Sequence, residues 1–179
     1  MDTERIDLDS LDFWSFVDFA VSRAGRLLPG IDPAAMRVIQ TMYRATSMVV
    51  YDMESTVHRP RGLSWPGFRV LFTVWLASPL EARKVAELTG MSRGAVSAVL
   101  ATLERDGLVV KDRAPHDGRA VHVGLTERGQ EVIAEVFQVQ NIREQEWAGA
   151  LTPQEQRTFV GLLEKIIASS GRIKAKHRS

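Results

Sequence analysis

Hydrogen-bond donors and very small side chains alternate along one short stretch of this chain. The donors are Ser92, Arg93 and Ser97, and the small residues beside them are Gly94 and Ala98. Small side chains allow a helix to approach the major groove of DNA closely, and hydroxyl and guanidinium groups donate to base edges or phosphate oxygens. These residue types at this spacing therefore predict contact with duplex DNA. The alternative interpretation is an ordinary helix face exposed to solvent.

A second group of charged residues follows in a predicted β-hairpin. Residues 108–111 and 120–123 are rich in β-forming side chains, and residues 115–118, with the sequence Pro-His-Asp-Gly, join them. Asp-Gly between two such runs is a strong hairpin signal. The tip can enter a minor groove, where the negative potential favours arginine. An ion pair between Asp117 and Arg119 would fix that arginine, although a solvated turn remains the alternative. The charged or titratable side chains of the hairpin are Lys111, Arg113, His116, Asp117 and Arg119.

The donors need a helix with a buried side opposite them. Ser92 is a good N-cap, and Val96, Leu100 and Leu103 follow at spacings of four and three, which predicts one buried stripe. Asp106-Gly107 ends this helix. The hairpin is marginal by itself. We therefore expect it to pack on the preceding helices through Leu108, Val110 and Leu125.

A shorter helix is predicted just before the one that carries the donors. The sequence Ser78-Pro79-Leu80-Glu81 fits a capping box with proline at the first helical position. Val85, Ala86 and Leu88 would lie on the inner side of this helix, and Gly90 would end it. Two helices joined by a tight glycine-containing turn predict a helix-turn-helix.

Helical patterns also precede the helix-turn-helix. Residues 10–28 form one predicted helix, and Asp32-Pro33 caps a second that runs to about His58. Along this second helix, apolar residues recur at alternating spacings of four and three, which predicts a packing seam. A short, very apolar helix is expected over residues 66–77.

Two more helices are predicted after the hairpin. Thr126 caps one that runs to about Trp147, and Thr152-Pro153-Gln154-Glu155 is a capping box that opens the last. We expect the last helix to bury its apolar face, and the long outer helices together carry more apolar surface than one small domain covers. Two interdigitating chains would bury it. The apolar face of the last helix comprises Phe159, Leu162, Leu163, Ile166 and Ile167.

The predicted fold class is mainly α with a small β-wing. It consists of a winged helix-turn-helix with N- and C-terminal dimerisation helices, in one structural domain. We predict N-terminal dimerisation helices over residues 1–58, the winged helix-turn-helix DNA-binding region over 59–125, C-terminal dimerisation helices over 126–170 and a basic disordered tail over 171–179.

The motifs together resemble the MarR family of winged-helix transcription regulators. The resemblance rests on residues 104–109 (Glu-Arg-Asp-Gly-Leu-Val), the Asp-Gly-Arg of the wing at 117–119 and Leu-Thr-Glu-Arg-Gly at 125–129. Residues 63–71 are also similar to the family's second helix, and the resemblance covers roughly residues 32–168. It implies a homodimer that binds a pseudo-palindromic operator, commonly as a repressor, and is released by a small anionic or phenolic ligand.

One residue departs from the family pattern. Members often carry an arginine where this chain has Ala98. Base reading is therefore expected to depend more on Arg93 and on the wing.

The resemblance also implies an effector pocket where the dimer helices meet the winged helix. The alternative for each aromatic residue in this region is an ordinary place in the core. We expect no cofactor and no metal. The residues expected to line the pocket are Tyr43, His58, Trp65, Phe68 and Phe72, with Trp75 beside them.

Composition restricts the class of protein. The chain has 179 residues, of which 45% are hydrophobic and 25% charged, as in ordinary globular proteins. It contains no cysteine, which excludes disulfides and thiol chemistry. It has no apolar run near ~18 residues, and its first residues are acidic, unlike a signal peptide. We therefore expect a cytoplasmic protein.

Charge is distributed unevenly although the net charge is only +1. Residues 1–58 contain 5 basic and 9 acidic residues, and residues 59–128 contain 11 basic and 7 acidic ones. Residues 129–179 contain 7 basic and 6 acidic residues. The positive charge thus coincides with the predicted DNA-binding region, as expected for a nucleic-acid binder.

Three other functions were weighed against DNA binding. Catalysis lacks support, since the chain has no phosphate-binding glycine loop and no nucleophile or zinc-protease motif. A metal-responsive regulator would need clustered ligands, whereas His58, His116, His122 and His177 are scattered. A winged helix that binds only other proteins stays open, although it would have little need of the arginines in the reader and the wing.

Overall fold

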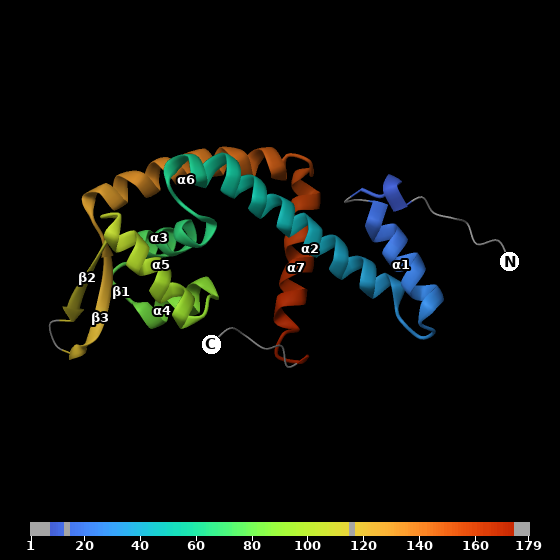
Figure 1. The fold of residues 1–179 in the computed structure, drawn as a ribbon, viewed down its shortest axis with the longest axis horizontal. Helices are drawn as coiled ribbons and strands as arrows, with labels where there is room; N and C mark the ends of the chain where they lie inside the picture. Colours follow the sequence, from blue (N-terminus) through green and yellow to red (C-terminus); the bar gives the residue numbers. More distant parts are fainter. Residues whose placement is uncertain (1–7, 13–14, 115–116, 174–179) are drawn as a thin grey trace. The chain divides into compact units, whose positions relative to one another are not determined.

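The chain folds into two compact units, residues 1–51 and residues 52–179 (Figure 1). The computed structural model describes residues 8–12, 15–114 and 117–173, with the backbone alone at residue 8 and at residues 113–121.

The first unit is a pair of helices, α1 (Ser15–Leu27) and most of α2 (Pro33–Met53). The carboxylate of Asp32 accepts hydrogen bonds of 2.9 and 3.0 Å from two backbone N–H groups of the first turn of α2. The predicted cap at Asp32 is thereby confirmed. Val17 and Val21 of α1 are buried, and Asp18 forms an ion pair with Arg37 of α2.

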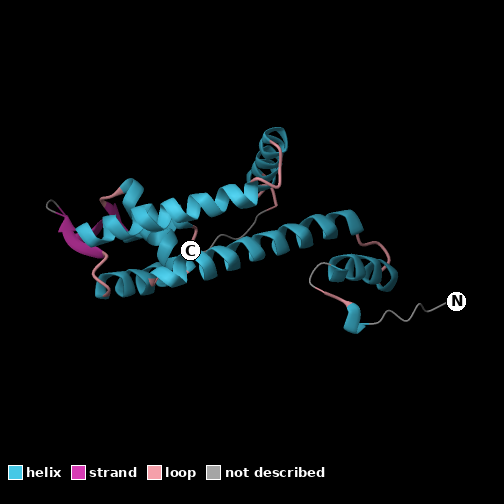
Figure 2. Cartoon of the chain, turned by 90° about the horizontal axis from the view of Figure 1, so that it is seen from above, coloured by secondary structure: helices cyan, strands magenta, loops and turns pink. Residues whose placement is uncertain are grey.

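The second unit begins inside the last turn of α2 and contains the winged helix. After α2 come a π-helical turn (Glu54–His58) and a 3-10 turn (Arg59–Arg61). The strands lie at one end of this unit, beside the shorter helices (Figure 2). The remaining elements are α3 (Trp65–Ala77), β1 (Leu80–Glu81), α4 (Ala82–Thr89), α5 (Arg93–Arg105), β2 (Val109–Ala114), β3 (Asp117–Leu125), α6 (Glu127–Ala148) and α7 (Pro153–Ala168). The predicted fold class, mainly α with a small β-wing, is confirmed.

Helices α4 and α5 form the predicted helix-turn-helix. Gly90 ends α4 in the left-handed conformation, with φ of 64°. The Met91 N–H then donates to the Ala86 carbonyl at 3.2 Å, which closes the turn. Ser92 caps α5 by accepting from the Ala95 N–H at 3.3 Å, as expected.

The capping box predicted at Ser78 is wrong. Ser78 instead terminates α3, because its N–H donates to the Val74 carbonyl at 2.9 Å. Leu80 and Glu81 form β1, which pairs with Val123 and His122 of β3. These pairing partners lie about forty residues further along the chain, so the local pattern gave no sign of them. Leu88 was also placed wrongly on the inner side of α4, since it is 51% exposed.

The sheet is antiparallel with the strand order β1-β3-β2. Val109 is 2% exposed and Val110 is 41% exposed, so the prediction that Val110 faces the helices is wrong. Leu108 still belongs to the end of α5, because its N–H donates to the Leu103 carbonyl at 2.9 Å. The alternation of side chains therefore starts one residue later than expected, at Val109.

The start of α6 is locked to the end of α5. The hydroxyl of Thr126 accepts from the Gly129 N–H at 2.9 Å and donates to the Gly107 carbonyl at 2.7 Å. The Thr126 N–H donates to the Leu108 carbonyl at 3.1 Å. A Cβ atom at Gly129 would lie only 2.0 Å from that carbonyl oxygen, so glycine is required by this close approach.

Side chains from every element of the winged helix meet in one core. Those from α3 are the most deeply buried, because this helix lies between α4, α5, β3 and α6. The fully buried core residues include Val70, Leu71, Val74, Val85, Val96, Leu100, Val123, Ile133 and Val136.

Helix α7 begins as predicted but does not bury its apolar face within the chain. Thr152 and Glu155 form the capping box, with hydrogen bonds of 3.3 Å (Glu155 N–H to the hydroxyl) and 2.8 Å (Thr152 N–H to the carboxylate). None of the residues of α7 is buried. The expectation that this face is buried is therefore wrong for a single chain. The exposed apolar residues are Phe159, Val160, Leu162, Ile166 and Ile167.

Membrane insertion through a helix finds no support within the described ranges, where none is both long and apolar enough to cross a bilayer.

Candidate DNA-binding site and aromatic cluster

Helix α5 has two distinct faces. Val96, Leu100 and Leu103 are buried in the core, as the spacing predicted. Arg93 and Gly94 lie on the opposite side and are exposed. The exposed residues of this face are Arg93, Gly94, Ser97, Ala98 and Ala101, and Ser92 at the N-cap is half-buried. The structure thus brings the five predicted DNA-reading residues of this stretch to one surface.

Neighbouring elements fix the position of α5. Arg69 of α3 donates a hydrogen bond to the Thr89 carbonyl at the end of α4. The Lys111 ammonium of β2 forms an ion pair with Glu104 of α5 at 2.6 Å. Lys111 therefore holds the base of the hairpin against α5.

The hairpin places the remaining predicted residues on two paired strands. Arg113 belongs to β2, and Asp117 and Arg119 belong to β3, with Arg113 paired to Val121. The described backbone thus carries these three positions side by side in the wing. His116 and the predicted ion pair between Asp117 and Arg119 lie outside the described residues and side chains.

Four of the five residues predicted to line an effector pocket form a continuous aromatic cluster. The imidazole of His58 stacks on Phe68 with a centroid distance of 4.5 Å and on Trp65 at 5.4 Å. Phe72 continues the stack, 5.5 Å from Phe68 and 4.9 Å from Phe137 of α6. The fifth residue, Tyr43, belongs to the first unit, where it is 69% exposed.

His58 is a buried hydrogen-bond donor in this cluster. It is 0% exposed, and its Nε2 lies 2.7 Å from Oε1 of Gln140. The Gln140 amide nitrogen donates to Glu144, so its oxygen accepts from His58 Nε2–H. Nδ1 then carries a lone pair, for which the described residues offer no hydrogen-bond partner. Burial lowers the pKa of His58 below its usual range, which favours this neutral form.

Sequence reasoning missed Gln140. It lies on the buried stripe of α6 with Ile133 and Val136. A polar residue at the third position of an otherwise apolar stripe is the signal that marks a buried hydrogen-bond partner.

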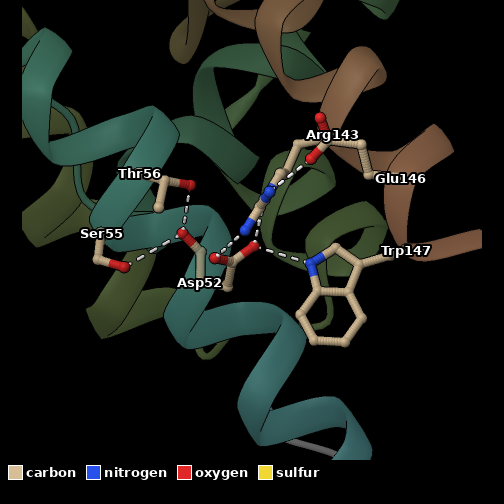
Figure 3. Close-up of polar contacts among 6 residues, drawn as sticks. All are labelled: Asp52, Ser55, Thr56, Arg143, Glu146 and Trp147. Atoms are coloured by element: carbon tan, nitrogen blue, oxygen red, sulfur yellow. Dashed lines mark hydrogen bonds and ion pairs between the residues drawn. The ribbon is translucent and has the colours of Figure 1, made fainter.

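A charged cluster ties the end of α2 to the second half of α6 (Figure 3). The Asp52 carboxylate accepts two hydrogen bonds from Arg143, each of 2.7 Å, and a third of 2.7 Å from the Trp147 indole. The Arg143 contacts hold the pKa of Asp52 below its usual range. The Asp52 carbonyl also accepts from the hydroxyls of Ser55 and Thr56 at the start of the π-helical turn.

Three polar links therefore connect the segment after α2 to α6. Their order is reversed along the two segments, as expected when a helix and its neighbour run in opposite directions. The links are Asp52 to Arg143, His58 to Gln140 and Arg61 to Glu135. They hold the aromatic cluster between the π-helical turn, α3 and α6.

No group of three or more histidine, cysteine or carboxylate side chains suited to a metal ion occurs in the described part of the chain. His58 is occupied by the cluster and Gln140, and His122 lies on β3.

Comparison with known proteins gives a consistent result. Residues 61–120 match the model of the MarR family. The chain is 33% identical over 132 residues to YwaE of Bacillus subtilis, an uncharacterised HTH-type transcriptional regulator. This match covers 74% of this chain and 77% of YwaE.

Solved structures with the same fold include regulators bound to DNA. The transcriptional repressor CouR, bound to a 23-mer DNA duplex, is 26% identical, with a TM-score of 0.67 over 72% of this chain and 90% of CouR. BpsR of Bordetella bronchiseptica, whose DNA binding is regulated by 6-hydroxynicotinic acid, is 25% identical. Its TM-score is 0.67 over 73% of this chain and 98% of BpsR.

Proposed function

Because this chain belongs to the MarR family of DNA-binding transcriptional regulators, we propose that it is a homodimeric repressor of a pseudo-palindromic operator, released by a small aromatic or anionic ligand. The observation that carries the proposal is the exposed, small and donor-rich face of α5 beside a two-stranded wing. The relatives are regulators of transcription and not enzymes. A DNA partner is consistent with a cytoplasmic location, which we propose as well.

We assign sequence reading to α5 and to the wing. Arg93 has the geometry to donate two hydrogen bonds to a guanine edge, and Ser92 and Ser97 supply shorter donors. Gly94 and Ala98 allow the helix to approach the base pairs. In the wing, Arg113, His116, Asp117 and Arg119 would follow the adjacent minor groove and its phosphates.

The exposed apolar surfaces support a homodimer. The apolar side chains of α7 and those of Val38 and Ile39 on α2 are exposed in the single chain. Large exposed apolar surfaces mark interaction sites. A two-fold axis would bury them and place two copies of α5 about one helical turn of DNA apart, roughly 34 Å.

Base reading by Arg93 and phosphate binding by Arg119 are expected to respond differently to alanine substitution. Arg93→Ala should cost about 1–3 kcal/mol on the operator and relax sequence preference. Arg119→Ala should weaken binding to all sequences and lower the salt slope by about one for each half-site. Fluorescence anisotropy measures both, with a duplex of the gene's upstream region and a scrambled duplex at two salt concentrations. Equal, weak binding of the unmodified protein to both duplexes would contradict the proposed function.

The aromatic cluster is our proposed effector site, formed by Tyr43, His58, Trp65, Phe68 and Phe72. The buried lone pair on His58 Nδ1 can accept a hydrogen bond from a phenolic hydroxyl. The stacked rings next to it suit an aromatic ligand. Similarity to BpsR, which responds to a hydroxylated aromatic acid, adds support.

A panel of hydroxybenzoic acids is expected to quench the fluorescence of Trp65 and release the protein from its operator. His58→Phe keeps the stacking area but removes the acceptor, so it should retain DNA binding and lose the response to the panel. If both proteins are released at the same ligand concentration, His58 does not take part in effector binding.

A further inference from the structure

A groove of about 900 Å³ lies beside the helix-turn-helix, outside the residues assigned above to the wing. It is bounded by the outer side of α4, by β1, by the start of α5 and by β3. The side chains along it are unusually rich in charge. The titratable residues that line it are Glu81, Arg83, Lys84, Glu87, Arg93 and His122.

Two cations of the groove are held by carboxylates of the same segment. The Arg83 guanidinium lies 2.7 Å from the Glu81 carboxylate, and the Lys84 ammonium lies 2.8 Å from the Glu87 carboxylate. The side chains of Arg83 and Lys84 are 75% and 46% exposed. Exposed pairs of this kind contribute little to folding stability. The arrangement therefore calls for an explanation other than stability.

The N-terminus of α4 opens into the same region. Glu81 is the N-cap residue of α4, yet its side chain makes no capping hydrogen bond. Its carboxylate is directed to Arg83 instead. The first turn of α4 thus lacks a side-chain acceptor, a condition that favours an anion near its backbone N–H groups.

The groove is continuous with the proposed base-reading surface. Arg93, the first residue of α5, lines it. Helix α4 and the far ends of β2 and β3 lie on the side of this unit opposite α6 (Figure 1). In a helix-turn-helix, the first helix crosses the sugar-phosphate backbone while the second enters the major groove.

We propose that this groove binds the sugar-phosphate backbone of the operator through Arg83 and Lys84, and that Glu81 and Glu87 restrain these cations in the free protein. The inference rests on the proposed function, since it concerns the same DNA. A phosphate that enters must displace each carboxylate from its cation. The carboxylates then repel the DNA, so they lower affinity for every sequence alike.

Phosphate contacts carry no sequence information, which gives the proposal a sharp readout. Loss of one cation should weaken binding to the upstream duplex and to a scrambled duplex by the same factor. A slope change of about 0.9 for each subunit corresponds to roughly tenfold in Kd at 50 mM salt relative to 1 M. Removal of one carboxylate charge about 6 Å from a phosphate should tighten both complexes about threefold, as expected for a charge pair in water.

The experiment compares Arg83→Ala, Lys84→Ala and Glu87→Gln with the unmodified full-length protein. Fluorescence anisotropy gives Kd for both duplexes at 50, 100 and 200 mM salt. Arg157→Ala and Glu164→Gln, on exposed positions of α7 outside its apolar residues, remove the same charges elsewhere. Thermal melting followed by circular dichroism checks folding, which the exposed positions of Arg83 and Lys84 should leave unchanged.

Each outcome decides the assignment. Parallel weakening by both cation variants, with tightening by Glu87→Gln and no effect of the α7 controls, supports it. Weakening confined to the upstream duplex would assign base reading to α4 in place of phosphate binding. If Arg83→Ala and Lys84→Ala behave like Arg157→Ala while the unmodified protein still prefers its upstream duplex, the groove is wrong and the proposed function stands. Failure of the unmodified protein to bind either duplex would overturn both.

Discussion

Gly129→Ala is expected to destabilise the winged helix by about 3–5 kcal/mol, a large part of the total stability of a domain. The new Cβ would lie 2.0 Å from the Leu108 carbonyl oxygen and 2.9 Å from its carbon, both backbone atoms that no rotamer change can move away. Relief requires α6 to shift from the end of α5. That shift breaks the hydrogen bonds of Thr126 to the Gly107 and Leu108 carbonyls. Urea unfolding followed by circular dichroism measures the loss.

Gly94→Ala is the matched control for this substitution. A Cβ at Gly94 meets no atom within 4 Å, and alanine is a better helix former than glycine by about 1 kcal/mol. The control should therefore be as stable as the unmodified protein or slightly more stable. Equal unfolding midpoints for Gly129→Ala and the unmodified protein would show that the α5–α6 junction tolerates a wider separation than its geometry implies.

The second large effect concerns assembly. Leu162→Glu combined with Ile166→Glu should convert the proposed dimer to a monomer, because four carboxylates would enter the apolar interface. The single chain should stay folded, since α7 has no buried residue. Loss of the second half-site contact should weaken operator binding by at least about 100-fold. Sedimentation velocity and anisotropy titration measure the two effects.

Gln154→Glu combined with Lys165→Gln provides the control for assembly. It adds the same negative charge to α7 at exposed positions outside the apolar residues. This variant should stay dimeric and bind the operator normally. A dimer that survives Leu162→Glu with Ile166→Glu would place the interface on other elements than α7.

Local signals in the sequence predicted most helix boundaries. Ser92, Thr126 and Thr152 each cap the helix that was expected to follow, because an N-cap depends only on the next three residues. Ser78 was misread for the same reason. Its segment fits a capping box locally, but Leu80 and Glu81 gain backbone hydrogen bonds from β3, and this distant pairing prevails.

Side-chain direction was harder to predict where two motifs overlap. The apolar run Leu108-Val109-Val110 has no internal sign of where the strand starts. The helix-ending hydrogen bond from Leu108 to Leu103 sets that point and turns Val110 outward. A shift of one residue reverses every side chain of a strand.

The reading face of α5 could be predicted, whereas the groove beside it could not. Periodicity alone separates Val96 and Leu100 from Arg93. Arg83 and Lys84 are two charged residues on a short helix, a pattern that usually marks a solvated face. Their association with a concave surface depends on β1 and β3, which the tertiary fold brings together.

The separation of the two faces of α5 has a consequence for how such regulators diverge. Val96, Leu100 and Leu103 maintain the fold, while the side opposite them contacts no part of the core, so that even a methyl group at Gly94 meets open space. After gene duplication, the reading face can therefore accumulate substitutions without loss of folding stability. Operator preference can drift while the scaffold stays constant, and paralogues can acquire separate target genes one exposed side chain at a time.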